Sequence, residues 1–207
     1  MAAYTTIDNP ELYFQTKLWT GNDASPRAFT LDGDEDMQPD LVWIKNRSSG
    51  NDNILFDAVR GVNKSLRSDS ANAEDTTNND GSIQSFDTDG FTVYQPGTGD
   101  DKVNNSGSGT YVGWCWKGGT TSGITTNGST TITPAGYSFS ATSGVSIVKY
   151  AGNGSSGAKY PHGLGVTPKM VIVKNLGTTD WWNVHHASLG NNSEMYLNTT
   201  DAAPATS

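Results

Sequence analysis

The clearest apolar segments of the chain are short and bounded by residues that interrupt regular structure. Residues 41–45 (Leu-Val-Trp-Ile-Lys) and 170–174 (Met-Val-Ile-Val-Lys) each lie shortly after a proline and directly before an asparagine. Runs of this length, rich in β-branched residues, are typical of strands buried on both faces. Further strands are predicted at 82–86, 91–94 and 109–117, with a turn at 87–90.

Two other local patterns complete the predicted elements. Residues 124–132 are nearly palindromic around Asn127-Gly128, a dipeptide that favours the type I′ turn of a β-hairpin. Asn9-Pro10-Glu11 provides a cap and a first-turn proline, which predicts one short helical turn. The chain is therefore expected to be all-β, with β-sandwich (jelly-roll-like) units in tandem, short loops and little helix.

The strand pattern occurs twice. Residues 39–46 align with 168–175, an offset of 168 minus 39, or 129, and 56–61 align with 185–190 at the same offset. Two further matches have an offset of 131: 19–22 with 150–153, and Leu66 with Leu197. Because an internal repeat determines the architecture before any strand is assigned, the chain is predicted to contain two copies of one β unit.

The repeat divides the chain into four predicted segments. Residues 1–14 form an N-terminal docking segment, 15–118 the first copy, 119–144 a linker with the hairpin, and 145–207 an incomplete second copy. Counterparts of the strands after residue 82 would fall beyond Ser207. We therefore expect the natural gene product to be longer than this sequence.

Composition restricts the partners of the protein. Hydrophobic residues make up 34% and charged residues 16% of the chain, but six Trp, eight Tyr and six Phe favour a folded protein over a disordered one. The formal net charge of -8 argues against nucleic acid as a partner, since nucleic-acid binding needs a basic face. No apolar run reaches the roughly 20 residues of a membrane span, and no signal peptide is evident at the start.

The candidate chemical groups favour structural roles. The acidic run 32–36 lacks the Gly and Glu positions of an EF-hand, so a solvated loop is preferred over an ion site. His185 and His186 are adjacent and would point to opposite faces of a strand, and His162 is interpreted as a turn residue. The single cysteine, Cys115, is interpreted as a small buried hydrophobe. No cofactor, metal or catalytic residue is expected.

The adjacent residues Trp181 and Trp182 are the candidate ligand contact. Indole faces can stack on the apolar sides of sugar rings, so these residues could contact a host-surface glycan. The alternative interpretation is that one Trp packs inward and its neighbour covers an edge. This alternative is preferred.

The repeated blocks themselves resemble a known family. Tyr-x-Gly-Asn-Gly, Pro-His-Gly-Leu-Gly-x-x-Pro-Lys-Met-Val-Ile-Val-Lys-Asn and Trp-x-Val-x-His-Ala follow one another within residues 150–187. This pattern is similar to a module of virion structural proteins, often described as tail-fibre-like, of marine tailed bacteriophages. The first copy resembles the partner form of that module at 13–17, 41–48, 56–61 and 111–117.

The resemblance implies a virion component, made in the host cytoplasm and assembled into a tail fibre, spike or other host-attachment appendage. It also implies that the partners are other virion proteins and further copies of the chain, commonly as a homotrimer. Two alternatives remain: a carbohydrate-binding module for host-surface glycans, and a glycan depolymerase, which would need a carboxylate pair in a cleft. Because the acidic residues lie in apparent turns, the protein is not expected to be an enzyme.

Overall fold

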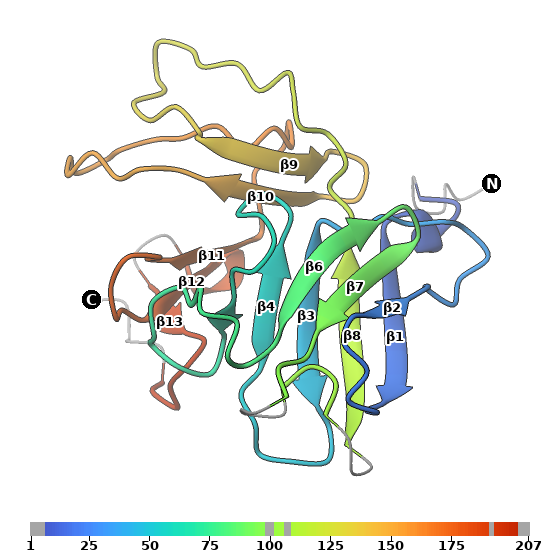
Figure 1. Cartoon of the computed structure of the whole chain (residues 1–207). Coiled ribbons are helices and arrows are strands. Elements are labelled where there is room, and N and C mark those ends of the chain that lie inside the picture. Colours follow the sequence, from blue (N-terminus) through green and yellow to red (C-terminus); the bar gives the residue numbers. More distant parts are fainter. Residues whose placement is uncertain (1–6, 98–101, 106–108, 191–192, 203–207) are drawn as a thin grey trace.

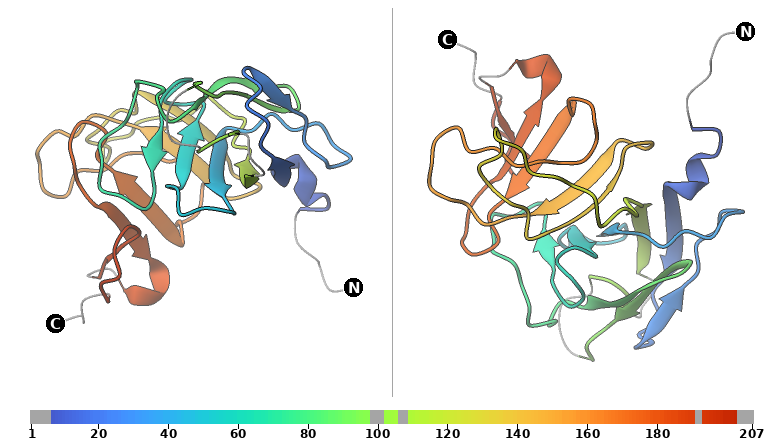
Figure 2. Two further views of the ribbon diagram at one scale, coloured as in Figure 1. Left: turned by 60° about the horizontal axis from the view of Figure 1, so that its bottom comes forward. Right: turned by 90° about the horizontal axis from the view of Figure 1, so that it is seen from above.

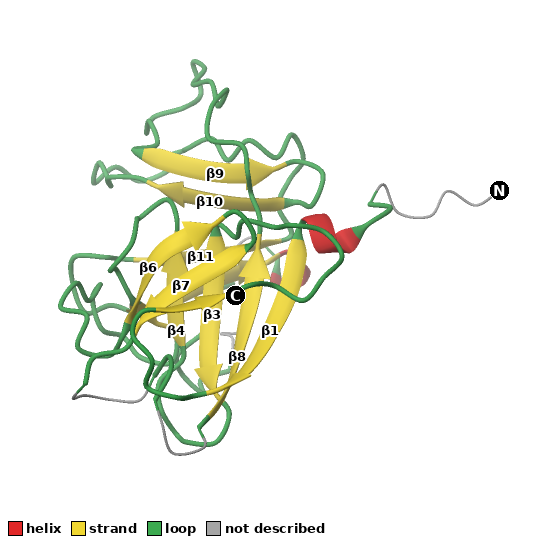
Figure 3. Ribbon diagram, turned by 45° about the vertical axis from the view of Figure 1, so that its right-hand side comes forward, coloured by secondary structure: helices red, strands yellow, loops and turns green. Residues whose placement is uncertain are grey.

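The computed structural model describes residues 7–97, 102–105, 109–190 and 193–202. These residues form an all-β protein in which 35% of the chain is strand and no helix reaches seven residues. The expectation of a sandwich-like all-β fold with little helix is confirmed. The described residues contain two short helical turns. Figure 3 shows the strands in yellow and the helical turns in red.

The larger layer is an antiparallel five-stranded sheet (Figure 1). Its order is β1–β8–β3–β4–β5, so β8 enters between two strands that are much earlier in the sequence. The bounds are β1 Phe14–Thr20, β8 Thr110–Trp116, β3 Leu41–Asn46, β4 Ile54–Asp57 and β5 Leu66–Arg67. The expected strands at 41–45 and 109–117 correspond to β3 and β8.

A three-stranded sheet covers one face of the larger sheet. Its order is β2–β7–β6, with bounds Arg27–Phe29, Gly90–Tyr94 and Ser82–Asp87. The expected strands around the turn at 87–90 are confirmed as β6 and β7. Between the sheets, Trp19 stacks on Tyr111 with ring centroids 5.4 Å apart and meets Phe29 at 4.5 Å. This aromatic centre belongs to a core of fourteen buried residues.

The hairpin β9–β10 lies above the sandwich in Figure 1, with bounds Gly136–Ser140 and Val145–Lys149. The hairpin predicted around Asn127-Gly128 is wrong. Asn127 and Thr130 form only an isolated turn, and the N–H groups of Thr131 and Ile132 donate to the carbonyl of Lys159. Neither Asn127 nor Gly128 has the positive φ that a type I′ turn requires.

A second antiparallel sheet, β11–β12–β13, lies beside the sandwich. Its bounds are β11 Met170–Lys174, β12 Trp182–His186 and β13 Met195–Tyr196, and the short helix η2 (Ala187–Leu189) follows β12. Its loops contact the loop after β5. The N–H of Glu74 donates to Leu176 at 3.0 Å, and that of Asp180 donates to Ala71 at 2.8 Å. Figure 2 shows this packing from two further sides.

The strands β3–β4–β5, which we call the first meander, and β11–β12–β13, the second meander, have the same register. Leu41 lies opposite Asp57, and Met170 lies opposite His186, so both partners are displaced by 129 residues. Equivalent hydrogen bonds follow: Ala58 donates to Asp40, and Ala187 donates to Lys169. The two meanders are therefore structurally equivalent strand by strand.

The register corrects one alignment and one burial expectation. Leu55 pairs with Leu66, and the equivalent Val184 pairs with Met195, so the counterpart of Leu66 is Met195 rather than Leu197.

The expectation that both apolar strands are buried on both faces is wrong. β3 is fully buried on alternate positions only, and β11 has no fully buried residue. The reason is that β3 is covered by the second layer, whereas β11 is an edge strand.

The N-terminal segment is described from residue 7 onward, and residues 1–6 of the predicted docking segment lie outside the described residues. The predicted helical turn is present as η1 (Pro10–Leu12). Its cap is Asn9, whose side-chain oxygen accepts a hydrogen bond from the N–H of Glu11 at 3.0 Å. This turn leads directly into β1.

Candidate functional site

The outer face of the five-stranded sheet carries several large apolar side chains. Alternation along β1, β8 and β3 points one set of residues into the core and the other set outward. The outward set, which we call the aromatic face, consists of Phe14, Leu18, Trp43, Trp114 and Trp116. Register places these residues in adjacent rows of neighbouring strands.

The aromatic face is partly open to solvent. Leu18 is 58% exposed and Phe14 is 38% exposed, while the three Trp residues are half-buried. Phe14 lies 5.1 Å from Trp116 between ring centroids, and Trp43 meets Trp114 edge-on at 6.1 Å. Neighbouring rings with exposed aliphatic carbons at their border are typical of protein interfaces.

The two candidate Trp residues have opposite environments. Trp182, on β12, is only 4% exposed, and its indole N–H donates to the carbonyls of Arg67 at 2.9 Å and Ser70 at 3.1 Å. A buried indole has no free face for a sugar ring, so Trp182 does not serve as a glycan contact and instead anchors the second meander to the sandwich. Trp181 is 50% exposed and does not share this role.

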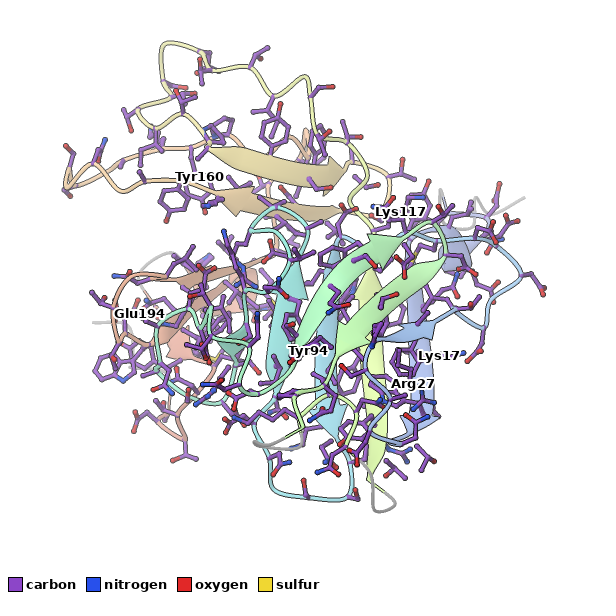
Figure 4. All side chains as sticks on the ribbon, viewed as in Figure 1. Lys17, Arg27, Tyr94, Lys117, Tyr160 and Glu194 are labelled. Atoms are coloured by element: carbon purple, nitrogen blue, oxygen red, sulfur yellow. The ribbon has the colours of Figure 1, made fainter. Side chains whose placement is uncertain are left out.

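Trp181 forms an aromatic pair with Tyr196 of β13, and their ring centroids are 4.6 Å apart. The hydroxyl of Tyr196 donates to Glu194 Oε1 at 3.0 Å, and this hydrogen bond raises the pKa of the phenol. Figure 4 labels Glu194 beside this sheet. A shallow open depression is formed mainly by the residues that directly follow Tyr196. It is lined by Asp69, Leu197, Asn198, Thr199, Thr200 and Asp201. A ring platform beside amide, hydroxyl and carboxylate groups is suited to a polyhydroxylated ligand.

The face of the second meander that carries this pair is polar where the first meander is apolar. Ile54 and Phe56 are 0% and 1% exposed in the core, whereas their counterparts, Asn183 and His185, are half-buried. Because the two positions are equivalent in register, the difference lies in the side chains and in what covers them. The second meander therefore presents a surface where the first presents a core.

The histidines and the acidic run have local partners. His185 Nδ1 lies 3.5 Å from the carbonyl of Ser193, and His186 Nδ1 lies 2.6 Å from the hydroxyl of Ser188. His162 Nδ1 accepts from the N–H of Leu164, as expected for a turn residue. Asp32 forms an ion pair with Lys17. In the part of the chain that the structure describes, no group of three or more His, Cys, Asp or Glu residues could hold a metal.

A charged cluster stabilises the loops at the edge of the sandwich. Lys102 Nζ lies 2.9 Å from carboxylate oxygens of both Asp52 and Asp80, and Arg67 also pairs with these two residues. Burial alone would raise the pKa of Asp80, but hydrogen bonds and charges from Lys102 and Arg67 hold it below its usual value. A proton donor in a depolymerase needs the opposite shift, so this carboxylate is not suited to general acid catalysis.

Cys115 is buried in the core, with 0% of the residue exposed. Burial raises the pKa of this thiol to about 12. Because only a thiolate reacts readily, this environment makes the cysteine inert and fits its interpretation as a hydrophobe.

Sequence reasoning missed Tyr196, which completes the aromatic pair. The only sequence signal that could have located it was the alignment of the second copy with the first. That alignment matched Leu66 with Leu197 instead of Met195, so it was shifted by two residues in this region. In correct register, Tyr196 corresponds to Arg67, an ion-paired residue, so the repeat offered no aromatic precedent at this position. The aromatic face was also missed, because it needs the order β1–β8–β3, which the sequence does not show.

The fold and its surfaces define an all-β sandwich protein with an exposed aromatic face and an aromatic pair on a second meander. The chain belongs to the family described as "Domain of unknown function (DUF7483)", whose model matches residues 9–207. No curated protein and no solved structure matches the chain. Within the described residues, no helix has both the length and the apolar character to cross a membrane.

Proposed function

We propose that this protein is a structural subunit of a bacteriophage virion, acting as a component of a tail fibre or another appendage in particle attachment and host adsorption. The observation that carries the proposal is the aromatic face, because exposed rows of apolar side chains on a sheet are suited to contact with another protein. The resemblance of the repeated blocks to virion proteins supports it. The expected assembly is a homo-oligomer, with a homotrimer as the first model.

Self-association through the aromatic face can be tested by measuring the molar mass in solution by light scattering after size-exclusion chromatography. The wild-type protein should form a stable oligomer, and Leu18→Lys should dissociate it, because the substitution places a charge at the most exposed position of the face. Val62→Lys is the control, because Val62 is also exposed, at 41%, but lies in the loop after β4. A wild-type monomer at all concentrations would contradict the proposal.

Location on the particle is a separate test. Antibody labelling of intact phage particles, followed by electron microscopy, should place the protein on an appendage. Its absence from purified particles would contradict the virion assignment, whatever the oligomeric state.

A second function, recognition of host-surface glycans, is supported by the exposed pair of Trp181 and Tyr196 beside a depression with polar lining. On the same face, Asn183 and His185 replace Ile54 and Phe56 of the first meander. These polar side chains favour contact with a hydrated ligand over burial in a protein core. In this role the platform would be Trp181 together with Tyr196, and Trp182 would hold the sheet beneath them in place.

Binding of the protein to host polysaccharides on a glycan array tests this second function. Trp181→Ala should reduce any binding at least about tenfold, because stacking of a flat ligand group such as a nucleobase on an aromatic ring contributes on the order of 1–3 kcal/mol, and we expect a contribution of similar size from a sugar ring. Val62→Ala is the control at an exposed apolar position elsewhere. Binding that survives Trp181→Ala, or no binding to any host polysaccharide, would contradict a glycan role for this pair.

A further inference from the structure

The free edge of β11 differs from the equivalent edge of β3. In the first meander, β3 pairs with β4 on one side and with β8 on the other. In the second meander, β11 pairs with β12 and is the last strand of its sheet. In Figure 1 the β9–β10 hairpin lies above β11, on the side away from β12.

Backbone groups on the free edge can be assigned from the hydrogen-bond pattern. The carbonyl of Lys169 accepts from Ala187, which faces β12, and consecutive residues of an antiparallel strand face alternate sides. Val171 and Val173 therefore face β12, while Met170 and Ile172 direct their N–H and C=O groups to the open edge. The equivalent positions in the first meander are Leu41 and Trp43, which face β8.

The side chains at this edge lack the cover that their counterparts have. Met170 is 51% exposed and Ile172 is 42% exposed. Their counterparts are half-buried: Leu41 lies opposite Trp116 of β8, and Trp43 lies opposite Trp114. Aromatic rings at alternate positions of β8 thus cover, in the first meander, the positions that are open in the second.

We propose that the free edge of β11 binds an antiparallel strand of the β8 type, supplied by a partner polypeptide. Such a strand is an extended segment with aromatic residues at alternate positions, as at Trp114 and Trp116, and with a small residue such as Gly113 where the core side is crowded. The chain's own β8 is held between β1 and β3, so the strand comes from outside the described fold. Edge strands with exposed apolar residues are established templates for strand addition.

This inference goes beyond the proposed function and does not depend on it. The occupant is identified by the equivalence of the two meanders, which gives the orientation, the register and the side chains of the incoming strand. Met170 would lie opposite the residue equivalent to Trp116, and Ile172 opposite that equivalent to Trp114.

The probe is a fluorescein-labelled synthetic peptide with the sequence of residues 109–117 and Cys115 replaced by Ser. We expect saturable binding to the intact protein, measured by fluorescence anisotropy. Ile172→Pro should weaken this binding at least about tenfold, because proline removes an edge N–H that faces away from β12. Thr16→Pro is the matched control: it removes an N–H that faces away from β8 on the free edge of β1, at a residue that does not belong to the aromatic face, and should change binding less than about twofold.

A second variant keeps the test valid if Ile172→Pro does not fold. Ile172→Thr retains the N–H and the β propensity, but loses apolar area, and should weaken binding by about threefold to tenfold. Bound peptide should also slow hydrogen exchange at the amides of Met170 and Ile172.

Three outcomes would overturn the proposal. They are the absence of peptide binding, a loss of binding with Thr16→Pro as large as with Ile172→Pro, and pairing of two copies of this chain through the β11 edge. The last outcome would be seen as a wild-type dimer that Ile172→Pro dissociates and the peptide does not.

Discussion

The first and second meanders share a register but differ in their surroundings. Val42 and Ile44 of β3 are both 0% exposed, whereas their counterparts, Val171 and Val173, are half-buried. The first meander has β8 at its edge and the β2–β7–β6 sheet over its face. The second has neither among the described strands. One backbone pattern thus forms part of a core in one place and a surface in the other.

The comparison teaches that side-chain chemistry follows what covers the sheet. Where a second layer lies above, the residues are Ile54 and Phe56; where it does not, the equivalent positions carry Asn183 and His185. Burying a polar group without a partner costs free energy, so polar residues at these positions are suited to an open or hydrated face. The aromatic pair lies on that same open face.

The largest expected difference concerns Phe56 and His185, which occupy equivalent positions. Phe56→Ala should lower the free energy of unfolding by about 3–5 kcal/mol, because it removes a fully buried ring from the core. His185→Ala should change it by less than about 1 kcal/mol, because the side chain is half-buried. Urea denaturation of both variants measures the difference, and equal losses would contradict the distinction between core and surface.

The substitution Trp182→Phe tests whether Trp182 anchors the second meander to the sandwich. This substitution keeps an aromatic ring but removes the N–H that donates to Arg67 and Ser70, and it leaves two carbonyls without that donor. We expect a loss of about 1–3 kcal/mol. Trp181→Phe is the control and should have an effect within about 0.5 kcal/mol, since Trp181 is exposed. An equal effect of the two substitutions would show that Trp182 is not an anchor.

The charged cluster around Arg67 gives the first unit a dependence on pH. Because the pKa of Asp80 is lower in the folded protein, its contribution to stability is present above the unfolded value of about 3.9 and is lost as the pH falls through the folded value. Asp80→Asn should therefore flatten the loss of stability below about pH 4. Thermal melts over roughly pH 2 to 7 measure how stability changes with pH in the wild type and in Asp80→Asn. An unchanged pH dependence in the variant would contradict the account.

Sequence patterns predicted the strands better than their environment. Apolar runs located β3 and β11, and the turn residues located β6 and β7, because these signals are local. The palindrome around Asn127-Gly128 failed because a distant residue, Lys159, provides the hydrogen-bond acceptor for its second half. Local propensity cannot anticipate such a partner.

The candidate sites were predicted only in part for the same reason. Trp181 and Trp182 are adjacent in sequence, so alternation predicts that one is buried, but which one depends on the distant carbonyls of Arg67 and Ser70. Tyr196 lies opposite Asn183 only because β13 pairs with β12 in a specific register. The free edge of β11 could not be predicted from the sequence, because it depends on the strand order: β3 has a neighbour on both sides and β11 on one side.

The central claim is that the second meander is an open copy of the first, and amide hydrogen exchange followed by NMR tests it most directly. In the isolated protein, Met170 and Ile172 should exchange quickly, whereas Val171 and Val173, which face β12, should be protected. In β3, by contrast, both Leu41 and Val42 should be protected, because β3 is paired on both sides. Strong protection of Ile172, equal to that of Trp43, would contradict the claim.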